Sequence, residues 1–391
     1  MKAVEKKITR ILILSAPVGS GHKMASQALA EAFSAMPDTL VTQGDVFTFF
    51  PAFLGKSFLT CYKAILRFCP GLYALSYRWG NAGSGSLFLR NLINRVLLRC
   101  GKNYLTDVAP DVVLSTHGTP TGILSLYKKK YAPQLRIGVV VTDYTVHRWL
   151  VYPEVDVYFI AEQALEEQVA KALSTQETGP SVSRAFGIPV REMLLPFCVA
   201  VGRQEARREI CRGFGWPEDV FIVLISGGGE GLLPMEEIIS LLAAESHTKL
   251  RLIAVTGHNT LLREQLQEGR YGTNSRLEIL GFTEELPKLI GAANLMIGKG
   301  GGISIAECLA LGTPLLIYSP LPGQEQKNTE FLVQNQGAGV AFTVEEIAAA
   351  VRKEMAKTPA ERERERESLR RRLGHPEAAK KIAGFTKSLT I

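Results

Sequence analysis

Short runs of aliphatic and β-branched residues alternate with helical stretches twice along this 391-residue chain. This alternation predicts βαβ units and an α/β fold of parallel, doubly wound sheets, because parallel neighbours need a crossover connection. Two series predict two Rossmann-like domains that face a cleft, since ligands bind at the carboxyl ends of such strands. The runs are RILILSA, LVTQGDVF, DVVLSTH, RIGVVVTD, VDVYFIA and RAFGIPV, then VFIVLISGGG, KLRLIAVTG, LEILGF, NLMIGKGG and PLLIYSP.

The two series also set the expected domain boundaries. Residues 1–195 are predicted to form an N-terminal domain, 196–216 a linker with a connecting helix, and 217–391 a C-terminal domain that includes the last helices. The chain is long enough for each domain to bury its own core. In the last part, ERERERESLRRRL alternates charge at helical spacing and predicts a solvated surface helix.

Composition excludes several classes of protein. With 46% hydrophobic and 21% charged residues, the chain is typical of soluble globular proteins. Its six cysteines form no CxxC and have no metal-ligand spacing, which predicts reduced thiols in the cytoplasm, with no disulfide framework and no zinc site. No stretch approaches the ~20 apolar residues that span a bilayer.

The positive charge is concentrated in one segment. Between Asp45 and Asp107 there is no acidic residue but there are eight Lys or Arg; subtracting eight from the net charge of +7 leaves the rest of the chain at −1. The segment is rich in Phe, Leu, Tyr and Trp, and helices with a basic and an aromatic face lie at membrane interfaces. Core helices with solvated basic rims are the alternative. Nucleic acid is not expected, because no RNP, zinc-finger or helix-turn-helix signature accompanies the charge. The residues assigned to acceptor or membrane contact are Lys63, Arg67, Arg90, Arg95, His147 and Trp149.

Two glycine-rich stretches follow strands in the second series. LISGGGEG contains Gly228 and Gly229, and IGKGGGIS contains Gly300–Gly302 at the start of a predicted helix. Glycines there let backbone N–H groups and a helix N-terminus approach a phosphate closely, although many strand–helix turns need glycine without any ligand. Neither stretch satisfies the dinucleotide GxGxxG pattern, and LGKSF is no Walker A loop, because Phe50 stands where glycine is required.

Polar side chains follow the second glycine loop. Ser304 and Glu307 share one face of the predicted helix, and a carboxylate one turn in can accept both hydroxyls of a ribose. After the next strand, PLPGQEQKN brings Gln324 and Glu325 behind a Pro-Gly turn. Amide and carboxylate groups suit the vicinal hydroxyls of a sugar. A solvent-facing helix start is the alternative for this last pair.

Six stretches occur in the order seen in one family. The stretches are SAPVGSGHKMASQALAEAF, VVVTDYTVHRW, FGIPVR, ISGGGEG, GKGGGISIAECLALGTPLLI and PGQEQKN, and the likeness covers roughly residues 8 to 345. The chain resembles the monogalactosyldiacylglycerol synthase and processive diacylglycerol glucosyltransferase family, within glycosyltransferase family 28. The resemblance implies a GT-B fold, a UDP-sugar donor in the C-terminal domain, a lipid acceptor at the N-terminal domain and inversion at the anomeric carbon.

The resemblance also implies roles for individual residues. His22 ends the first glycine loop where the family has its proposed catalytic base. The glycines of the two later loops would face the diphosphate, Glu307 the ribose, Gln324 and Glu325 the donor sugar, and the backbone near Phe282 the uracil. KGGG stands where many members have Lys-Pro-Gly-Gly, and GSGH where others have GGGH or GNGH. Glycine in place of proline at 300 should loosen that turn and adds one N–H donor.

The reaction itself needs a base for the acceptor hydroxyl and a positive field for the departing diphosphate. Imidazole titrates near neutrality, so His22 can serve as the base. Asp143, at the end of VVVTD, would orient His22 or bind the acceptor, while Lys299 and His258 would lie near the phosphates. For His117 and His147 a structural role is the alternative. The chain contains no D-x-D, so we expect a reaction without metal and no cofactor besides the UDP-sugar.

Together these observations predict an enzyme at the inner face of the cell membrane. It would move glucose or galactose from a UDP-sugar to diacylglycerol. One alternative is transfer of N-acetylglucosamine to another lipid, such as a polyprenyl-linked or lipid A-type acceptor. A UDP-sugar isomerase or a noncatalytic UDP-sugar sensor is a third interpretation, but a soluble isomerase does not need the basic aromatic segment and a sensor does not need His22 as a base.

Overall fold

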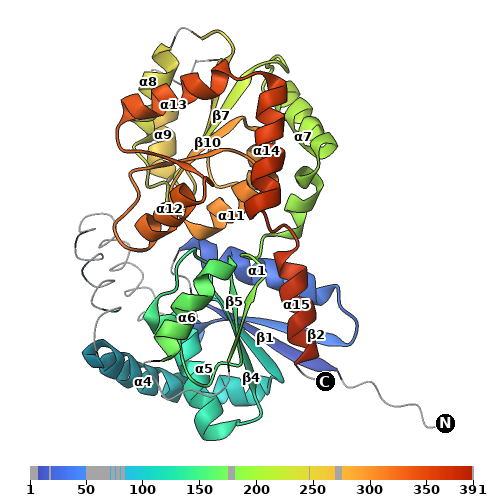
Figure 1. Ribbon diagram of the computed structural model, residues 1–391, viewed down its shortest axis with the longest axis vertical. Helices are drawn as coiled ribbons and strands as arrows, with labels where there is room; N and C mark the ends of the chain where they lie inside the picture. The colour runs from blue at the N-terminus through green and yellow to red at the C-terminus, as the bar shows by residue number, and fades with distance from the viewer. Residues whose placement is uncertain are drawn as a thin grey trace, which may run out of the picture. The chain divides into compact units, whose positions relative to one another are not determined.

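The computed structural model describes residues 8–16, 19–49, 71, 75, 80, 84–174, 181–245, 247–268 and 275–389. The chain forms two compact units, coloured along the sequence in Figure 1. The first comprises Met1–Glu192, Pro322–Gln324 and Glu377–Ile391, and the second comprises Met193–Leu321 and Glu325–Pro376.

The first unit is built on a six-stranded parallel sheet of order β2-β1-β3-β4-β5-β6. Its central strands are continuous apolar runs because helices cover both faces of such a sheet. This is the doubly wound architecture predicted from the first series. The strands are β1 (Thr9–Ser15), β2 (Thr39–Asp45), β3 (Val112–Ser115), β4 (Arg136–Val140), β5 (Val157–Ile160) and β6 (Val182–Ala185).

Helices connect these strands. Helix α1 (Ser20–Ser34) buries Ala25, Leu29 and Phe33, which lie on one face at helical spacing. The other connecting helices are α4 (Ser84–Val108), α5 (Gly118–Tyr131) and α6 (Glu166–Leu173), with short 3-10 turns η1 (Val46–Phe49), η2 (Arg148–Leu150) and η3 (Gln163–Leu165).

The last helix, α15 (Ala378–Ser388), belongs to the first unit although it ends the described chain. It packs against α1 (Figure 1). Ile382 and Ala383 are fully buried in one cluster with Leu29, Phe33 and Phe159. The boundary expected from the sequence, which gave all residues from 217 onward to the second domain, therefore differs from the structure here. The sequence of a short amphipathic helix predicts that one face is buried, but it does not show which sheet that face packs against.

The second unit also contains six parallel strands, in the order β12-β11-β10-β7-β8-β9. Five of them match the predicted series, and the sixth, β12, is a three-residue strand that begins at a glycine. The strands are β7 (Phe221–Ser226), β8 (Leu250–Val255), β9 (Leu277–Leu280), β10 (Leu295–Gly298), β11 (Leu315–Tyr318) and β12 (Gly339–Ala341).

The helices of the second unit enclose a separate apolar core. They include the segment read from the sequence as a linker, because 3-10 turn η4 (Glu192–Cys198) leads into α7, which packs on α10. The helices are α7 (Ala200–Gly213), α8 (Met235–Ala244), α9 (Thr260–Glu268), α10 (Leu286–Ala292), α11 (Gly302–Leu311), α12 (Gln324–Gln334), α13 (Val344–Ala356) and α14 (Pro359–Leu373).

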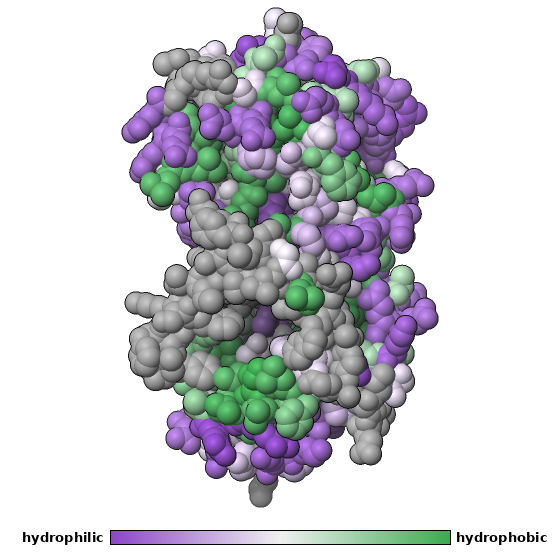
Figure 2. Space-filling view, turned by 90° about the vertical axis from the view of Figure 1, so that its left-hand side faces the viewer, coloured by the Kyte–Doolittle hydropathy of each residue, from purple (hydrophilic) through white to green (hydrophobic). Residues whose placement is uncertain are grey.

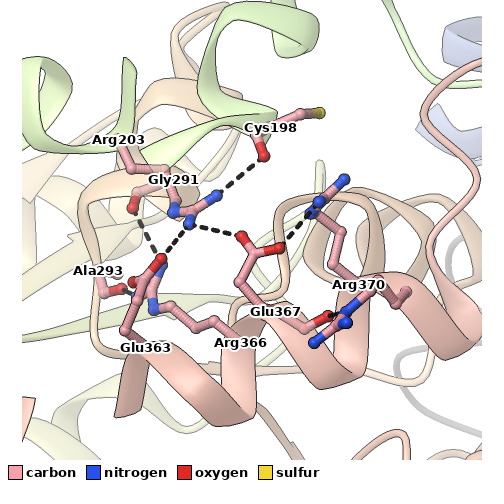
Figure 3. Close-up of polar contacts among 9 residues, drawn as sticks. Cys198, Arg203, Gly291, Ala293, Glu363, Arg366, Glu367 and Arg370 are labelled. Atoms are coloured by element: carbon pink, nitrogen blue, oxygen red, sulfur yellow. Dashed lines mark hydrogen bonds and ion pairs between the residues drawn. The ribbon is translucent and has the colours of Figure 1, made fainter. Parts of the chain in front are cut away.

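Helix α14, the charge-alternating segment, is not fully solvated. Its Arg366 is buried at 7% exposure and donates to the backbone carbonyls of Gly291 (3.3 Å) and Ala293 at the end of α10 (Figure 3). From α7, the buried Arg203 binds two α14 carboxylates and the carbonyl of Cys198. Cations near a helix C-terminus satisfy carbonyls that the helix leaves unpaired. The arginines thus fix α14 to the unit, and burial foremost lowers the pKa of Arg366 to about 10.

Candidate active site

In the first unit the sequence-predicted catalytic residues gather at the topological switch point. The chain runs from β1 to β2 on one side and returns to β3 on the other side of β1. His22 follows β1, His117 follows β3, and Asp143 follows β4. Open α/β sheets bind ligands at this point because the loops leave the sheet in opposite directions.

His22 lies in the first turn of α1. Gly19 is the N-cap of this helix and has a φ of 83°. This backbone conformation is strained for any residue with a side chain, so it favours glycine. The Nδ1 atom of His22 lies 3.0 Å from Thr142 Oγ1, and the hydroxyl of Thr116 donates to the His22 carbonyl at 3.3 Å. Burial lowers the pKa of His22, and the charge of Asp143 partly offsets that effect. The imidazole is therefore neutral near physiological pH.

Two further histidines cap the neighbouring helical turns. Nδ1 of His117 accepts from the backbone N–H of Thr119 at 3.2 Å, and Nδ1 of His147 accepts from the N–H of Trp149 at 3.2 Å. The rings of His22 and His117 meet edge to face with centroids 4.8 Å apart. Burial first, and then the proximity of His22 and of His147, lowers the pKa of His117 to about 3.

Asp143 is engaged by an amide side chain. Gln324, which the structure groups with the first unit, donates from its Nε2 to Asp143 Oδ2. The structure thus joins a residue predicted for catalysis with one predicted for donor binding.

In the second unit, the glycine loops flank the corresponding switch point. The chain passes from β7 through β8 to β9, then returns to β10 on the other side of β7. Gly227–Gly231 follows β7, and Lys299–Gly302 follows β10. The first loop interlocks with the loop after β8, because Gly229 accepts from the N–H of His258 at 2.8 Å. A Cβ at Gly257 would lie 2.5 Å from the carbonyl oxygen of Gly229, so these turns need glycine.

The second glycine loop is held against α12. Asn328, fully buried, donates from Nδ2 to the carbonyl of Gly300 at 2.9 Å. A Cβ at Gly300 would lie 2.7 Å from the Glu325 carbonyl oxygen. Because Gly300 has no Cβ, the loop packs closely on α12; that glycine loosens this turn relative to proline stays a prediction.

Lys299 and Glu325, both predicted to bind the donor, form an ion pair. Lys299 Nζ lies 3.0 Å from Glu325 Oε1, with the side chains 12% and 19% exposed. The other carboxylate oxygen of Glu325 accepts from the N–H of Leu321 at 3.0 Å. The Glu325 carboxylate is thus held at the first turn of α12.

The remaining predicted donor residues differ in exposure. The rings of His258 and Phe282 stack with centroids 4.3 Å apart, and Phe282 is 49% exposed. On α11, Ser304 is half-buried and Glu307 is buried at 2% exposure. Gly301 is the N-cap of α11, whose first N–H groups have no partner within the helix.

Comparison with known proteins assigns both halves of the chain to one family. Residues 22–190 match the family model for monogalactosyldiacylglycerol (MGDG) synthase, and residues 222–382 match the glycosyltransferase family 28 C-terminal domain. The chain belongs to glycosyltransferase family 28.

Curated relatives agree with this assignment. The enzyme is 26% identical over 349 residues to the processive diacylglycerol beta-glucosyltransferase of Bacillus subtilis (strain 168), covering 88% of this chain and 86% of the relative. It is 29% identical over 357 residues to the probable monogalactosyldiacylglycerol synthase 2, chloroplastic, of Oryza sativa subsp. indica, covering 84% and 70%. The resemblance stated from the motifs is confirmed.

Solved structures share the fold of this glycosyltransferase. MurG of Acinetobacter baumannii superposes with a TM-score of 0.61 at 15% identity, covering 97% of this chain and 99% of that one. Anabaena HepE in complex with UDP superposes with a TM-score of 0.54 at 13% identity, covering 97% and 100%. These similarities confirm the predicted GT-B fold.

The basic segment of the glycosyltransferase is described only in part. Lys63 and Arg67 lie outside the described residues. Arg90 was predicted to face a membrane, but it is buried at 4% exposure. Its guanidinium donates to the carbonyls of Arg148 and Val151 at 3.3 and 3.0 Å and lies 3.9 Å from the centre of the Tyr152 ring. The prediction for Arg90 is wrong, because its position on α4 turns the side chain inward.

Helix α4 nevertheless presents an apolar face to solvent, which we call the α4 apolar face. Arg95, Arg99 and Lys102 are exposed on the same helix. Figure 2 shows a hydrophobic patch on the side of the molecule where α4 lies. In the described part of the chain, no helix is both long and apolar enough to cross a bilayer. The face consists of Phe88 (72% exposed), Leu89 (40%), Leu92 (47%), Ile93 (39%) and Val96 (51%).

Sequence reasoning missed the residues that hold the predicted ones in place. Thr142 contacts the His22 ring, and Asn328 fixes the second glycine loop. Thr142 precedes Asp143 at the carboxyl end of β4, so its place next to a predicted site residue was a usable signal. Asn328 lies in the predicted PGQEQKN stretch but carries no spacing that reveals its partner. Among the described residues, no three His, Cys, Asp or Glu side chains gather closely enough to hold a metal ion.

Proposed function

We propose that this family 28 glycosyltransferase moves glucose or galactose from a UDP-sugar to diacylglycerol, with inversion, at an anionic membrane surface. The observation that carries the proposal is the position of two residue sets. His22 lies at the switch point of the first sheet, and two glycine loops lie at the switch point of the second. The names of the B. subtilis and rice relatives supply the acceptor class, and UDP bound to HepE supplies the donor class.

In the second unit, backbone N–H groups would bind the diphosphate of the donor. The diphosphate would bind between Gly228–Gly229 and the N-terminus of α11, where unpaired N–H groups and the helix dipole stabilise negative charge. Lys299 would add a positive charge near the leaving group while it remains paired with Glu325. Phe282 and the stacked His258 offer an exposed aromatic surface beside these loops for the uracil.

For the acceptor, His22 would act as the general base. As the hydroxyl oxygen of diacylglycerol attacks the anomeric carbon, its proton passes to the imidazole, and the bond to UDP breaks on the opposite face of the sugar. A neutral imidazole is required, and the lowered pKa of His22 supplies it at cellular pH. Asp143 would stabilise the imidazolium that forms, since its charge favours the protonated ring.

For the membrane, the α4 apolar face would insert into the interfacial region of the bilayer. Its exposed apolar side chains share a helix with Arg95, Arg99 and Lys102, and no acidic residue lies between Asp45 and Asp107. Amphipathic helices with this combination bind interfaces through apolar burial and attraction to anionic lipid. A diacylglycerol acceptor is itself confined to that surface.

The test is product formation from defined lipids. Purified protein is incubated with vesicles of phosphatidylglycerol and diacylglycerol and separately with UDP-glucose, UDP-galactose or UDP-N-acetylglucosamine, and the lipids are identified by mass spectrometry. We expect hexosyl-diacylglycerol from one of the first two donors. His22→Gln should lose most of this product while it binds UDP unchanged in calorimetry. No hexosyl-diacylglycerol with any donor, or transfer of N-acetylglucosamine to a polyprenyl-linked lipid instead, would refute the proposal.

A further inference from the structure

The three histidines at the switch point of the first sheet differ in what their Nδ1 atoms face. Nδ1 of His117 and Nδ1 of His147 each face a backbone N–H, at 3.2 Å in both cases. Nδ1 of His22 faces a hydroxyl, Thr142 Oγ1, at 3.0 Å. A backbone N–H can only donate, whereas a threonine hydroxyl can donate or accept.

This difference decides which nitrogen of His117 and His147 carries the proton. A neutral imidazole that accepts at Nδ1 must hold its hydrogen on Nε2. The Nε2 atoms of His117 and His147 are therefore N–H donors in the neutral rings. Neither residue can take a proton at Nε2 from an acceptor hydroxyl.

His22 is not restricted in this way. If Thr142 accepts from Nδ1–H, the lone pair of His22 Nε2 remains available. Within the described residues, Nε2 of His22 makes no hydrogen bond, and the side chain is half-buried. Thr142 itself is buried at 6% exposure, and His22 is its side-chain hydrogen-bond partner among the described residues. When its oxygen accepts from Nδ1–H, its own hydroxyl hydrogen is left to donate to water or to the bound acceptor.

We propose that Thr142 is a positioning residue that accepts a hydrogen bond from His22 Nδ1–H and so selects the tautomer with a basic Nε2. This rests on the proposed function above, in which His22 takes the acceptor proton. In the reaction Nε2 gains the hydroxyl proton, the acceptor oxygen bonds to the anomeric carbon, UDP leaves with the electron pair of the broken bond, and Thr142 holds the imidazolium through the same hydrogen bond. Of the three histidines, His22 alone is then suited to act as a base through Nε2.

The tautomer can be measured without any reaction. The full chain is labelled with 15N-histidine, and the six histidine side chains are resolved by long-range 1H–15N NMR at neutral pH. The loss of one signal set in His22→Gln assigns His22. We expect a protonated Nδ1 and an unprotonated Nε2, the opposite of the form that histidine favours in water. A proton on Nε2 of His22 in the wild-type protein overturns the proposal, whether or not the protein makes glycolipid.

Variants then connect the tautomer with catalysis. Thr142→Val removes the hydroxyl at nearly constant volume, so the proton should move to Nε2. We expect kcat to fall at least tenfold, which is part of the factor of about 10²–10⁴ that a general base supplies. KM for the UDP-sugar should stay unchanged, and Thr142→Ser should restore both the tautomer and kcat. Thr116→Val is the matched control, because Thr116 bonds the His22 carbonyl and not its ring, so the tautomer should persist. Thr142→Val with the wild-type tautomer or wild-type kcat contradicts the proposal.

Discussion

The protonation of His117 makes a quantitative prediction about acid stability. The pKa of His117 is lowered to about 3 in the folded protein, chiefly by burial, from 6.5 for a histidine side chain in water. As pH falls below 6.5 the unfolded chain binds a proton that the folded protein does not. Stability is therefore fully present above pH 6.5 and decreases as pH falls toward 3, by about 1.4 kcal/mol per unit. Lowering the pH from 7 to 5 should cost about 2 kcal/mol through this residue.

His117→Asn is the variant that isolates this effect. His117 caps α5 by accepting from the N–H of Thr119, and asparagine accepts at the same position as a preferred N-cap. The variant therefore keeps the hydrogen bond and removes the titration. At pH 7 its stability should be close to that of the wild-type protein, and at pH 5 the variant should be about 2 kcal/mol more stable relative to that baseline.

The assay is urea unfolding at pH 7 and pH 5, followed by tryptophan fluorescence in a Trp216→Phe background. Trp216 belongs to the second unit and Trp149 to the first, so in this background Trp149 reports on the first unit. The quantity of interest is the change with pH in the free-energy difference between variant and parent, which cancels the other titrating groups. Parallel pH dependences of the two proteins would refute the reasoning, because His117 would then titrate alike in folded and unfolded chains.

Three further predictions follow from packing and exposure. Gly300→Ala should destabilise the second unit by about 1–3 kcal/mol and lower its Tm by several degrees in calorimetry, because a Cβ there would lie 2.7 Å from the Glu325 carbonyl oxygen. Gly301→Ala is the control and should change Tm little, because a Cβ there would have nothing within 4 Å; equal Tm shifts in the two variants would contradict this prediction. Arg366→Met should cost about 2–5 kcal/mol in urea unfolding, since the Gly291 and Ala293 carbonyls lose their donor, whereas exposed Arg364→Met should be neutral. Phe88→Ser with Leu92→Ser should reduce sedimentation with phosphatidylglycerol vesicles at least severalfold without lowering Tm, and unchanged sedimentation would remove the α4 apolar face from membrane binding.

The fold was largely predictable because its strands are buried on both faces. A buried parallel strand is a continuous apolar run, and such runs mark β1, β3, β4, β7 and β8 directly. Strand β12, Gly339–Ala341, is short, begins at an exposed glycine and carries no such signal. For β6 the predicted run RAFGIPV lies further along the chain than the strand, which spans Val182–Ala185. The chain turns away from the strand at Gly187, which has a φ of 94°.

The candidate site likewise contains some residues that the sequence locates and others that it does not. Residues that directly follow strands, such as His22 and the glycine loops, can be located from the sequence because parallel strands end at one edge of a sheet. Partners set by tertiary packing cannot. Whether Arg90 faces solvent or the Tyr152 ring depends on the rotation of α4, and an arginine on a half-apolar helix fits either orientation. The Thr142 contact to His22 joins residues 120 positions apart, beyond any local pattern.

Helix α15 affects the order in which this protein can fold during synthesis. The ribosome releases the six strands of the first sheet before residue 190, but Ile382 and Ala383, which complete that core against Leu29 and Phe33, emerge only after the residues of the second unit. Until then the nascent first unit lacks the residues that cover Leu29 and Phe33 on α1, the helix whose N-terminal turn carries His22, while the second unit is still being translated. A newly made chain thus has an interval in which helix α1 lacks its packing partner α15, and chaperones or an early proteolytic cut would act in that interval.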